Sequence, residues 1–205
     1  ASAEDQSLSD TFNIGRANVK GVEAEITAAP IHGLTLSANY AYIHSKLSNI
    51  LAPAGSIFDP NVDPDATTAV GDDISDRFVL PFTPKHSLRL SGDWQVGEVG
   101  PGMVALHADY TWKDKAYTTS GAGVAVPNNH YPVNPAYGIV DGRISYHIDQ
   151  GAGRDITIAL WAKNLFDSRY PGFVVGAGSI RDGYHNAALT YGTPRTYGID
   201  IGFSF

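Results

Sequence analysis

Apolar and polar residues alternate along most of the chain with a period of two. In the first run, Val22, Ala24 and Ile26 are separated by Glu23 and Glu25. Successive side chains of a β-strand point to opposite faces, so such a run predicts a strand with one apolar and one polar face. Seven runs of this kind follow one another: 22–28, 34–42, 88–96, 104–112, 140–148, 156–162 and 197–205. No segment has the spacing of an amphipathic helix, and the sequence therefore predicts an all-β fold.

The connections between these runs are short and long in turn. Segments rich in Gly and Pro join the runs in pairs, and they are Pro30–Gly33, Gly97–Gly102 and Asp149–Gly153. Long segments separate the pairs, and they are Lys46–Leu80, Ala116–Pro135 and Asp167–Thr193. Long loops without structure are uncommon in compact soluble domains. Short turns at one end and long loops at the other are typical of an antiparallel, up-and-down transmembrane β-barrel with periplasmic turns and extracellular loops.

The composition of the two faces supports the same fold class. Charged residues make up 17% of the chain, below the roughly 25% of soluble domains. The polar face carries scattered Gly, Ser, Thr, Asp, Arg and His, which suits a water-containing lumen. Aromatic residues gather toward the ends of the runs, as expected at membrane interfaces: Tyr40, Tyr42, Tyr110, Trp112, Tyr146, Phe203 and Phe205. The alternative is a soluble β-sandwich with aromatic cross-strand pairs.

Several classes of protein are excluded or disfavoured. No window approaches the roughly 20 apolar residues of a membrane-spanning helix. The chain has no Cys, which excludes a disulfide framework, a thiolate metal site and a Cys nucleophile. The formal charge of −7 argues against a nucleic-acid partner. No nucleophile elbow, zinc-protease helix or P-loop is present, and we expect neither an enzyme nor a bound cofactor.

The acidic and histidine residues offer two further candidate sites. The loop from Asp59 to Asp76 is rich in Asp, but its spacing does not match a calcium-binding EF-hand. We therefore expect a solvated acidic loop and no metal site. Of the seven His, His107 and His147 should face the lumen, where ordinary hydrogen bonding is favoured over ligand contact. Asn164 and Asp167, where a strand gives way to a loop, should bond freed backbone groups.

Short motifs in a fixed order cover nearly the whole chain: Lys20–Glu25, Pro30–Leu36, Asn39–Tyr42, Leu80–Leu88, Asn164–Tyr170 and Gly192–Phe205. In this order they resemble the TonB-dependent outer-membrane receptors. The resemblance implies a siderophore-receptor type in the outer membrane of a Gram-negative bacterium. Such a receptor takes up iron–siderophore complexes or similar scarce nutrients by binding and gated transport. The resemblance also implies an assembly signal for the barrel-inserting machinery, although an amphipathic last strand explains the same residues: Tyr197, Ile199, Ile201, Phe203 and Phe205.

Two features depart from the family pattern. The N-terminal plug domain, through which the TonB system acts, is absent. Family barrels have 22 strands, whereas the chain has seven predicted strands, and an odd number does not close a bacterial barrel. We therefore expect residues 1–205 to form the C-terminal part of a receptor barrel. The alternative is a small complete outer-membrane barrel with a structural or adhesion role, in which Asp10–Arg16 supplies an eighth strand.

Candidate ligand contacts lie on the polar face and in the loops. Basic side chains would attract an anionic ferric complex, and aromatic side chains would stack on a planar chelate. The candidates are Arg89, Lys113, Arg143, Tyr117, His130, Tyr131 and Tyr184. The favoured alternative for the two Arg is ion pairing across neighbouring strands, with Asp93, Asp109 or Asp141 as the partners.

Overall fold

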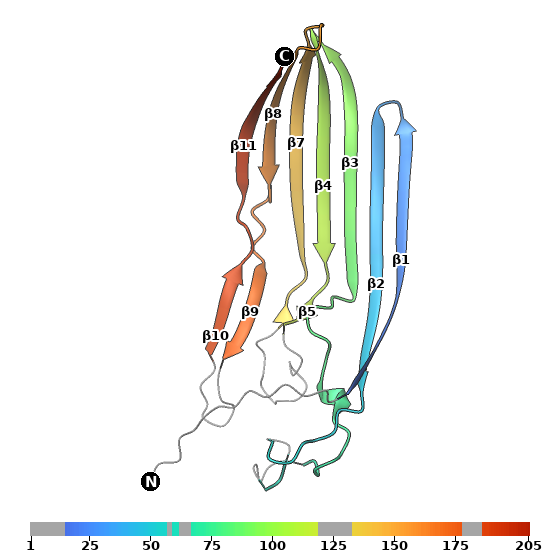
Figure 1. Ribbon diagram of the computed structural model, residues 1–205, viewed down its shortest axis with the longest axis vertical. Helices are drawn as coiled ribbons and strands as arrows, with labels where there is room; N and C mark the ends of the chain where they lie inside the picture. The colour runs from blue at the N-terminus through green and yellow to red at the C-terminus, as the bar shows by residue number, and fades with distance from the viewer. Residues whose placement is uncertain (1–14, 57–58, 62–66, 119–132, 178–185) are drawn as a thin grey trace.

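Seven long strands form one antiparallel sheet in which each strand pairs with the next long strand along the chain. The computed structural model describes residues 15–56, 59–61, 67–118, 133–177 and 186–205. The strands are β1 (Arg16–Ile31), β2 (Leu34–Ser48), β3 (His86–Val99), β4 (Gly102–Lys113), β7 (Tyr137–Asp149), β8 (Asp155–Lys163) and β11 (Thr196–Ser204). Figure 1 shows them side by side in this order. The predicted all-β meander is confirmed.

The two ends of the sheet differ as the alternation of short and long connections predicted. The turns β1–β2, β3–β4 and β7–β8 lie with the C-terminus at the upper end in Figure 1, which we call the turn end. The opposite end is the loop end. In the first turn, Gly33 has a φ of 77°, and a Cβ there would lie 2.6 Å from the carbonyl oxygen of Gln95. Only glycine fits this tight turn against β3.

The pairing register is regular over most of the sheet, with two exceptions: it shifts between Ala28 and Ile31 in β1, and again in β3. The register between β3 and β4 shifts between Gln95 and Gly97, which is the signature of a β-bulge. The alternation that the sequence predicted through Val96 is therefore wrong beyond Gln95. The strands also extend into the predicted turns, because β1 runs to Ile31 and β3 to Val99.

The long connections contain structure of their own. A 3-10 helix, η1, spans Ser75–Arg77, and two short hairpins form from β5 (Ala116–Tyr117) with β6 (Val133–Asn134) and from β9 (Pro171–Ala177) with β10 (Asn186–Tyr191). The sequence predicted long loops here, and the short hairpins within them were not predicted. Their signal in the sequence is weak, because two-residue strands have no period and β9 is rich in small residues.

Asn164 joins the sheet to the β9–β10 hairpin. Its side-chain amide donates to the carbonyl oxygens of Ser168 (3.0 Å) and Thr193 (3.1 Å), and its side-chain oxygen accepts from the N–H of Ser168 (2.8 Å). The N–H of Arg195 donates to the carboxylate of Asp167 at 3.1 Å. Asn164 and Asp167 have φ values of 50° and 55°, a region in which Asn and Asp are enriched. The prediction that both bond freed backbone groups is confirmed.

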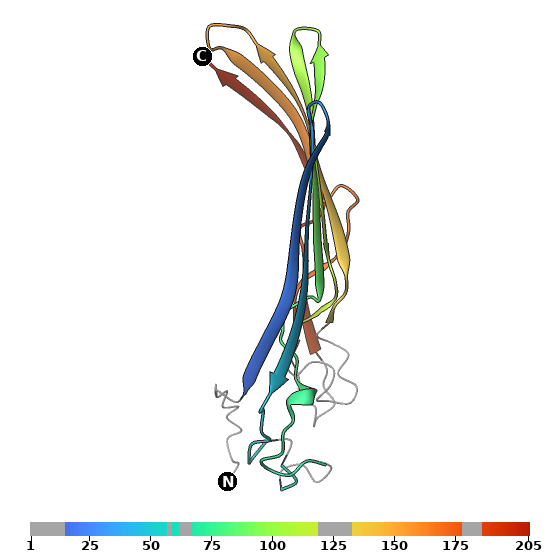
Figure 2. The ribbon, with the colours of Figure 1, turned by 90° about the vertical axis from the view of Figure 1, so that its right-hand side faces the viewer.

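The sheet is a single curved layer, as Figure 2 shows from its edge. Buried apolar residues in the described part of the chain are few. Ile50, Ala52 and Ile74 form a small cluster in the loops, and Ala159 lies in β8. Within the described residues no second sheet packs on the long one, so the soluble sandwich is not the observed fold. The same residues include no helix long and apolar enough to cross a membrane.

The outermost strands of the sheet are β1 and β11. They stand at opposite edges in Figure 1, and within the described residues they do not pair with each other. Arg16, the end of the proposed eighth strand, is the first residue of β1, and residues 10–14 lie outside the described part of the chain. The described sheet is therefore open and seven-stranded.

Candidate functional site

The middle of the polar face carries a network of charged side chains from β3 and β4. Arg89 donates to one carboxylate oxygen of Asp109 through Nε (3.1 Å) and Nη2 (2.9 Å). The ring of His107 lies between Asp93, at 2.7 Å from Nδ1, and the second oxygen of Asp109, at 2.5 Å from Nε2. The cross-strand pairing predicted for Arg89 is confirmed, as is ordinary hydrogen bonding for His107.

Arg143 on β7 reaches across β8 to the last strand. Its Nη1 lies 2.6 Å from a carboxylate oxygen of Asp200, and the indole N–H of Trp161 donates to the other oxygen at 3.1 Å. The prediction that Arg143 pairs with Asp93, Asp109 or Asp141 was wrong. Asp93 and Asp109 are bonded by His107 and Arg89, and Asp141 accepts the N–H of Asn164 at 2.8 Å.

The Asp200 pairing is possible because the residue between the two partners is small. On β8, Ala159 stands between Asp200 of β11 and Ser145 of β7. Arg143 is two residues before Ser145 on the same face of β7, so its side chain reaches Asp200 diagonally, past the small Ala159. Sequence reasoning missed Asp200 and Trp161 as members of the polar network. The alternation in β11 places Asp200 on the polar face, but which carboxylate an Arg takes depends on the packing of the side chains between them.

A second His makes local bonds nearer the turn end. His147 contacts the hydroxyl of Thr157 through Nδ1 at 3.0 Å, and its Nε2 lies 3.6 Å from Asp155. Ordinary hydrogen bonding was the prediction for this residue also, and it is confirmed. In the described part of the chain, no group of three or more His, Asp or Glu is arranged to hold a metal ion.

Lys113 differs from the two Arg because it forms no ion pair with any described residue. It is the last residue of β4, at the loop end of the sheet, and it is exposed. Its register partners are Ser87 on β3 and Tyr137 on β7. Lys113 and Arg89 line the same groove of about 410 Å³ on the polar face. Two of the predicted basic contacts are thus brought together, whereas Arg143 lies outside this groove.

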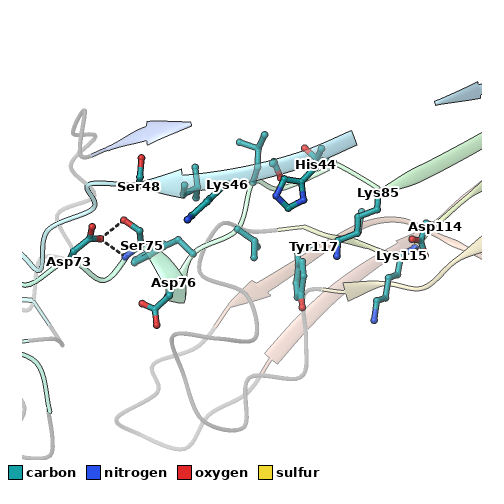
Figure 3. A pocket seen from close by; sticks show the side chains of 17 residues that line it. His44, Lys46, Ser48, Asp73, Ser75, Asp76, Lys85, Asp114, Lys115 and Tyr117 are labelled. Atoms are coloured by element: carbon teal, nitrogen blue, oxygen red, sulfur yellow. Dashed lines mark hydrogen bonds between the residues drawn. The ribbon is translucent and has the colours of Figure 1, made fainter. Parts of the chain in front are cut away.

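Tyr117 lines a larger cavity of about 800 Å³ at the loop end, between the end of β2, the β2–β3 loop and the segment after β4. Figure 3 shows its side chain near Lys85 and Lys115. The cavity also holds His44 and Lys46, so its basic groups come from three segments far apart in the sequence. His130, Tyr131 and Tyr184 lie outside the described residues.

The acidic loop uses its carboxylates to hold its own backbone. Asp59 is 5% exposed and accepts the N–H groups of Gly55 and Asn61, which hold the pKa of its carboxyl below the usual value. The hydroxyl and N–H of Ser75 lower the pKa of Asp73 in the same way. The prediction of a solvated loop fits the exposed Asp73 and was wrong for Asp59, which the turn buries.

The apolar face is exposed and is flanked by aromatic side chains. Val22, Ile144 and Ile199 are each more than half exposed, which on a soluble monomer would be an interaction surface. Near the loop end, the Tyr40 hydroxyl lies 2.7 Å from Nδ1 of His86. Near the turn end, the Tyr146 hydroxyl donates to the carbonyl oxygen of Val99 at 2.6 Å.

The apolar residues of β11 are exposed at the sheet edge: Tyr197, Ile199, Ile201 and Phe203, with Phe205 following.

The apolar stretch between these aromatic groups has the length of a strand that crosses a membrane. The stretch of β4 from Val104 to Trp112 measures roughly 27 Å at about 3.4 Å per residue. Val104 stands opposite Tyr146, so the stretch joins the two aromatic ends. A tilted transmembrane β-strand needs about 9–11 residues. The strand length and the exposed apolar face both fit a lipid environment.

Comparison with known proteins identifies the class. A model of the TonB-dependent receptor-like β-barrel family matches residues 2–165, and the chain belongs to this family. Members of the family are outer-membrane proteins of Gram-negative bacteria, and this chain is one of them. In such barrels the apolar face contacts lipid and the polar face lines the lumen.

The relatives are receptors for ferric siderophores. The ferric-pyoverdine M114 receptor PbuA of Pseudomonas sp. (strain M114) is 29% identical over 98% of this chain and 20% of its own length. The fold is similar to the ferric yersiniabactin uptake receptor FyuA from Yersinia pestis (TM-score 0.62, 20% identity, 94% of this chain and 24% of that chain). It is also similar to BauA, the ferric preacinetobactin receptor from Acinetobacter baumannii (TM-score 0.59, 18% identity, 95% and 23%). The chain thus spans about a fifth to a quarter of these relatives.

Proposed function

We propose that the chain forms the C-terminal part of the barrel of a TonB-dependent receptor that takes up ferric-siderophore complexes or similar scarce nutrients. The observation that carries the proposal is the two-sided sheet. One face is apolar and exposed along strands long enough to cross a membrane, and the other holds the basic groups that the proposal turns toward the lumen. The names of the relatives, all ferric-siderophore receptors, favour an iron complex as the ligand.

The proposed mechanism is binding and gated transport without making or breaking covalent bonds. Basic groups at the loop end, among them Lys85, Lys113 and Lys115, attract an anionic complex from outside the cell. The ion pairs of Arg89 and Arg143 hold the lumen wall in one arrangement. The proposal assigns the plug domain, and with it the contact to the TonB system, to a part of the receptor outside these 205 residues.

The open edges of the sheet support the proposed place in a larger barrel. An unpaired strand edge presents free N–H and C=O groups, and in lipid these groups need partners. In the proposed receptor, β1 pairs with the strand that precedes it and β11 closes the barrel against the first strand. The apolar residues of β11, ending at Phe205, then serve as the assembly signal for the barrel-inserting machinery.

Iron uptake by cells tests this function. Cells that lack the gene encoding this chain should lose uptake of ⁵⁵Fe from at least one ferric siderophore under iron limitation, and the complete gene should restore it. The restored uptake should disappear when the TonB system is deleted. Equal uptake by deleted and complemented cells, for every ferric siderophore on which the parent strain grows, would contradict the proposal.

A further inference from the structure

The groove on the polar face separates two acidic side chains from two basic ones, and among the described residues only one of the four, Arg89, has an ion-pair partner, Asp109. It lies across β1 to β4 at the loop end, and its floor is made of short side chains: Asn39, Ala41, Ser87 and Thr111. Glu23 and Glu25 on β1 line one side, and Arg89 and Lys113 line the other. The groove is therefore acidic at one end and basic at the other.

The register shows that Glu23 and Lys113 cannot satisfy each other. Glu23 stands opposite Ala41, Ala41 opposite Ser87, and Ser87 opposite Lys113. Three strand spacings of about 4.8 Å place Glu23 roughly 14 Å from Lys113. This separation exceeds the reach of the two side chains and the Debye length of about 8 Å at physiological salt. Glu23, Glu25 and Lys113 are exposed, and none forms an ion pair with a described residue.

An aromatic pair stands next to the basic end. Tyr137 on β7 is the register partner of Lys113, and its ring stacks on Tyr170 with centroids 4.4 Å apart and planes 13° apart. Tyr170 in turn packs against Gly192, where a Cβ would lie 2.0 Å from the ring. Gly192 thus holds Tyr170 in place, and Tyr170 in turn holds the ring of Tyr137, the register partner of Lys113.

We infer that this groove binds a zwitterionic ligand that carries an aromatic ring. The phenolate or catecholate oxygens of a ferric chelate pair with Lys113, the ring of that chelate packs beside Tyr137, and a protonated amine pairs with Glu23 and Glu25. A ligand with negative charge alone is disfavoured at the acidic end, and a purely cationic one at the basic end. The inference rests on the proposed function, because it takes the ligand to be a ferric chelate that enters the lumen.

Three iron complexes and two variants test the inference. The probes are the Fe(III) complexes of 2,3-dihydroxybenzoyl-lysine, of its Nε-acetylated twin, and of acetohydroxamate, which has no ring and no amine. Binding of each ⁵⁵Fe complex is measured on outer-membrane vesicles that hold the complete gene product, with vesicles from the deletion strain as background. The variants are E23Q/E25Q and K113M, and E98Q at the turn end of β3 is the matched control.

The inference predicts a pattern across probes and variants. The unaltered protein should bind the lysyl complex about tenfold more tightly than the acetylated twin, and this comparison needs no variant to fold. E23Q/E25Q should remove that preference, K113M should weaken both ring-bearing complexes, and E98Q should change neither. Heat-modifiable migration on gels checks that each variant reaches the membrane folded.

The two ways of failing are distinct. The groove inference is overturned if the lysyl and acetylated complexes bind with equal affinity, or if the preference for the lysyl complex survives E23Q/E25Q. In either case, binding of any ferric complex leaves the proposed function standing. Binding of none of the three complexes above background also overturns the groove inference. The proposed function is overturned by the separate uptake experiment described above, if deleted and complemented cells take up every ferric siderophore equally.

Discussion

The middle of the polar face and the groove at its loop end both contain acidic and basic side chains, but these are bonded to one another only in the middle. In the middle, Arg89, Asp109 and His107 are bonded to one another, and Arg143 is bonded to Asp200. In the groove, Lys113 and the two Glu of β1 have no partner among the described residues. Bonded charges hold neighbouring strands in register and have little left for a ligand. The unbonded charges are the ones that a ligand can use. Whether a charged residue is ion-paired therefore distinguishes the barrel wall from the ligand site better than its residue type does.

The largest predicted effect comes from disturbing the bonded region through its packing. A Cβ at Gly198 would lie 2.5 Å from the Trp161 ring, so Gly198→Ala displaces the indole and its bond to Asp200. We expect a loss of about 2 kcal/mol in the free energy of unfolding, which is typical of overpacking. Urea unfolding of the complete gene product in detergent micelles measures it.

Gly202→Ala is the matched control for this change. Gly202 lies on the same face of β11, and a Cβ there would be 4.0 Å from its nearest neighbour, the carbonyl oxygen of Thr157. Its stability should stay within about 0.5 kcal/mol of the unaltered protein. Equal losses for the two variants would show that the Trp161–Asp200 contact does not support the wall.

An intermediate effect separates the two regions directly. Asp109→Ala removes the shared partner of Arg89 and His107, and we expect a loss of about 1 kcal/mol in the free energy of unfolding, because Arg89 is largely exposed and regains water. Lys113→Met should change stability by less than about 0.5 kcal/mol. Urea unfolding of both variants makes the comparison, and a larger loss for Lys113→Met would contradict the distinction.

The smallest effect concerns a bonded carboxylate at the loop end. Hydrogen bonds from Ser75 lower the pKa of Asp73 in the folded protein, so they contribute stability above the unfolded-state pKa. That contribution is lost as the pH falls below about 4 and passes through the lowered folded-state pKa. The protection factor of the Ser75 amide, which is its exchange rate relative to an unstructured amide at the same pH, should therefore fall in acid. Ser75→Ala should move this change to higher pH, and an unmoved transition would show that Ser75 does not set it.

Much of the sheet could be predicted from the sequence, because its strands have one face in lipid and the other in a wet lumen. That asymmetry forces a period of two, which revealed the seven strands, the placement of Arg89 and His107 on the polar face, and the roles of Asn164 and Asp167. The bulge after Gln95 could not be predicted, because a bulge leaves no periodic signal in the sequence. The β9–β10 hairpin was not predicted for the same reason, since its residues do not alternate clearly.

The site was less predictable because it depends on which neighbours are already bonded. Arg143 pairs with Asp200, a residue far away in the sequence, past the small Ala159, and the nearer carboxylates are bonded to other groups. Lys113 and Arg89 look alike in the sequence, and the register alone shows that Lys113 lies beyond the reach of the acidic side chains on β1. Tyr137 and Tyr170 were not among the expected contacts, because their stacking joins two segments that no motif connects.

The central claim is that adjacent residues of one strand face lipid and lumen. These 205 residues contain no Cys, so a spin label on a Cys introduced at Ile144 or at Ser145 reports a single position within them. In outer-membrane vesicles, power saturation should show the label at position 144 accessible to oxygen and shielded from a water-soluble nickel complex. The label at position 145 should show the reverse. Equal exposure of both labels to the nickel complex would contradict the account.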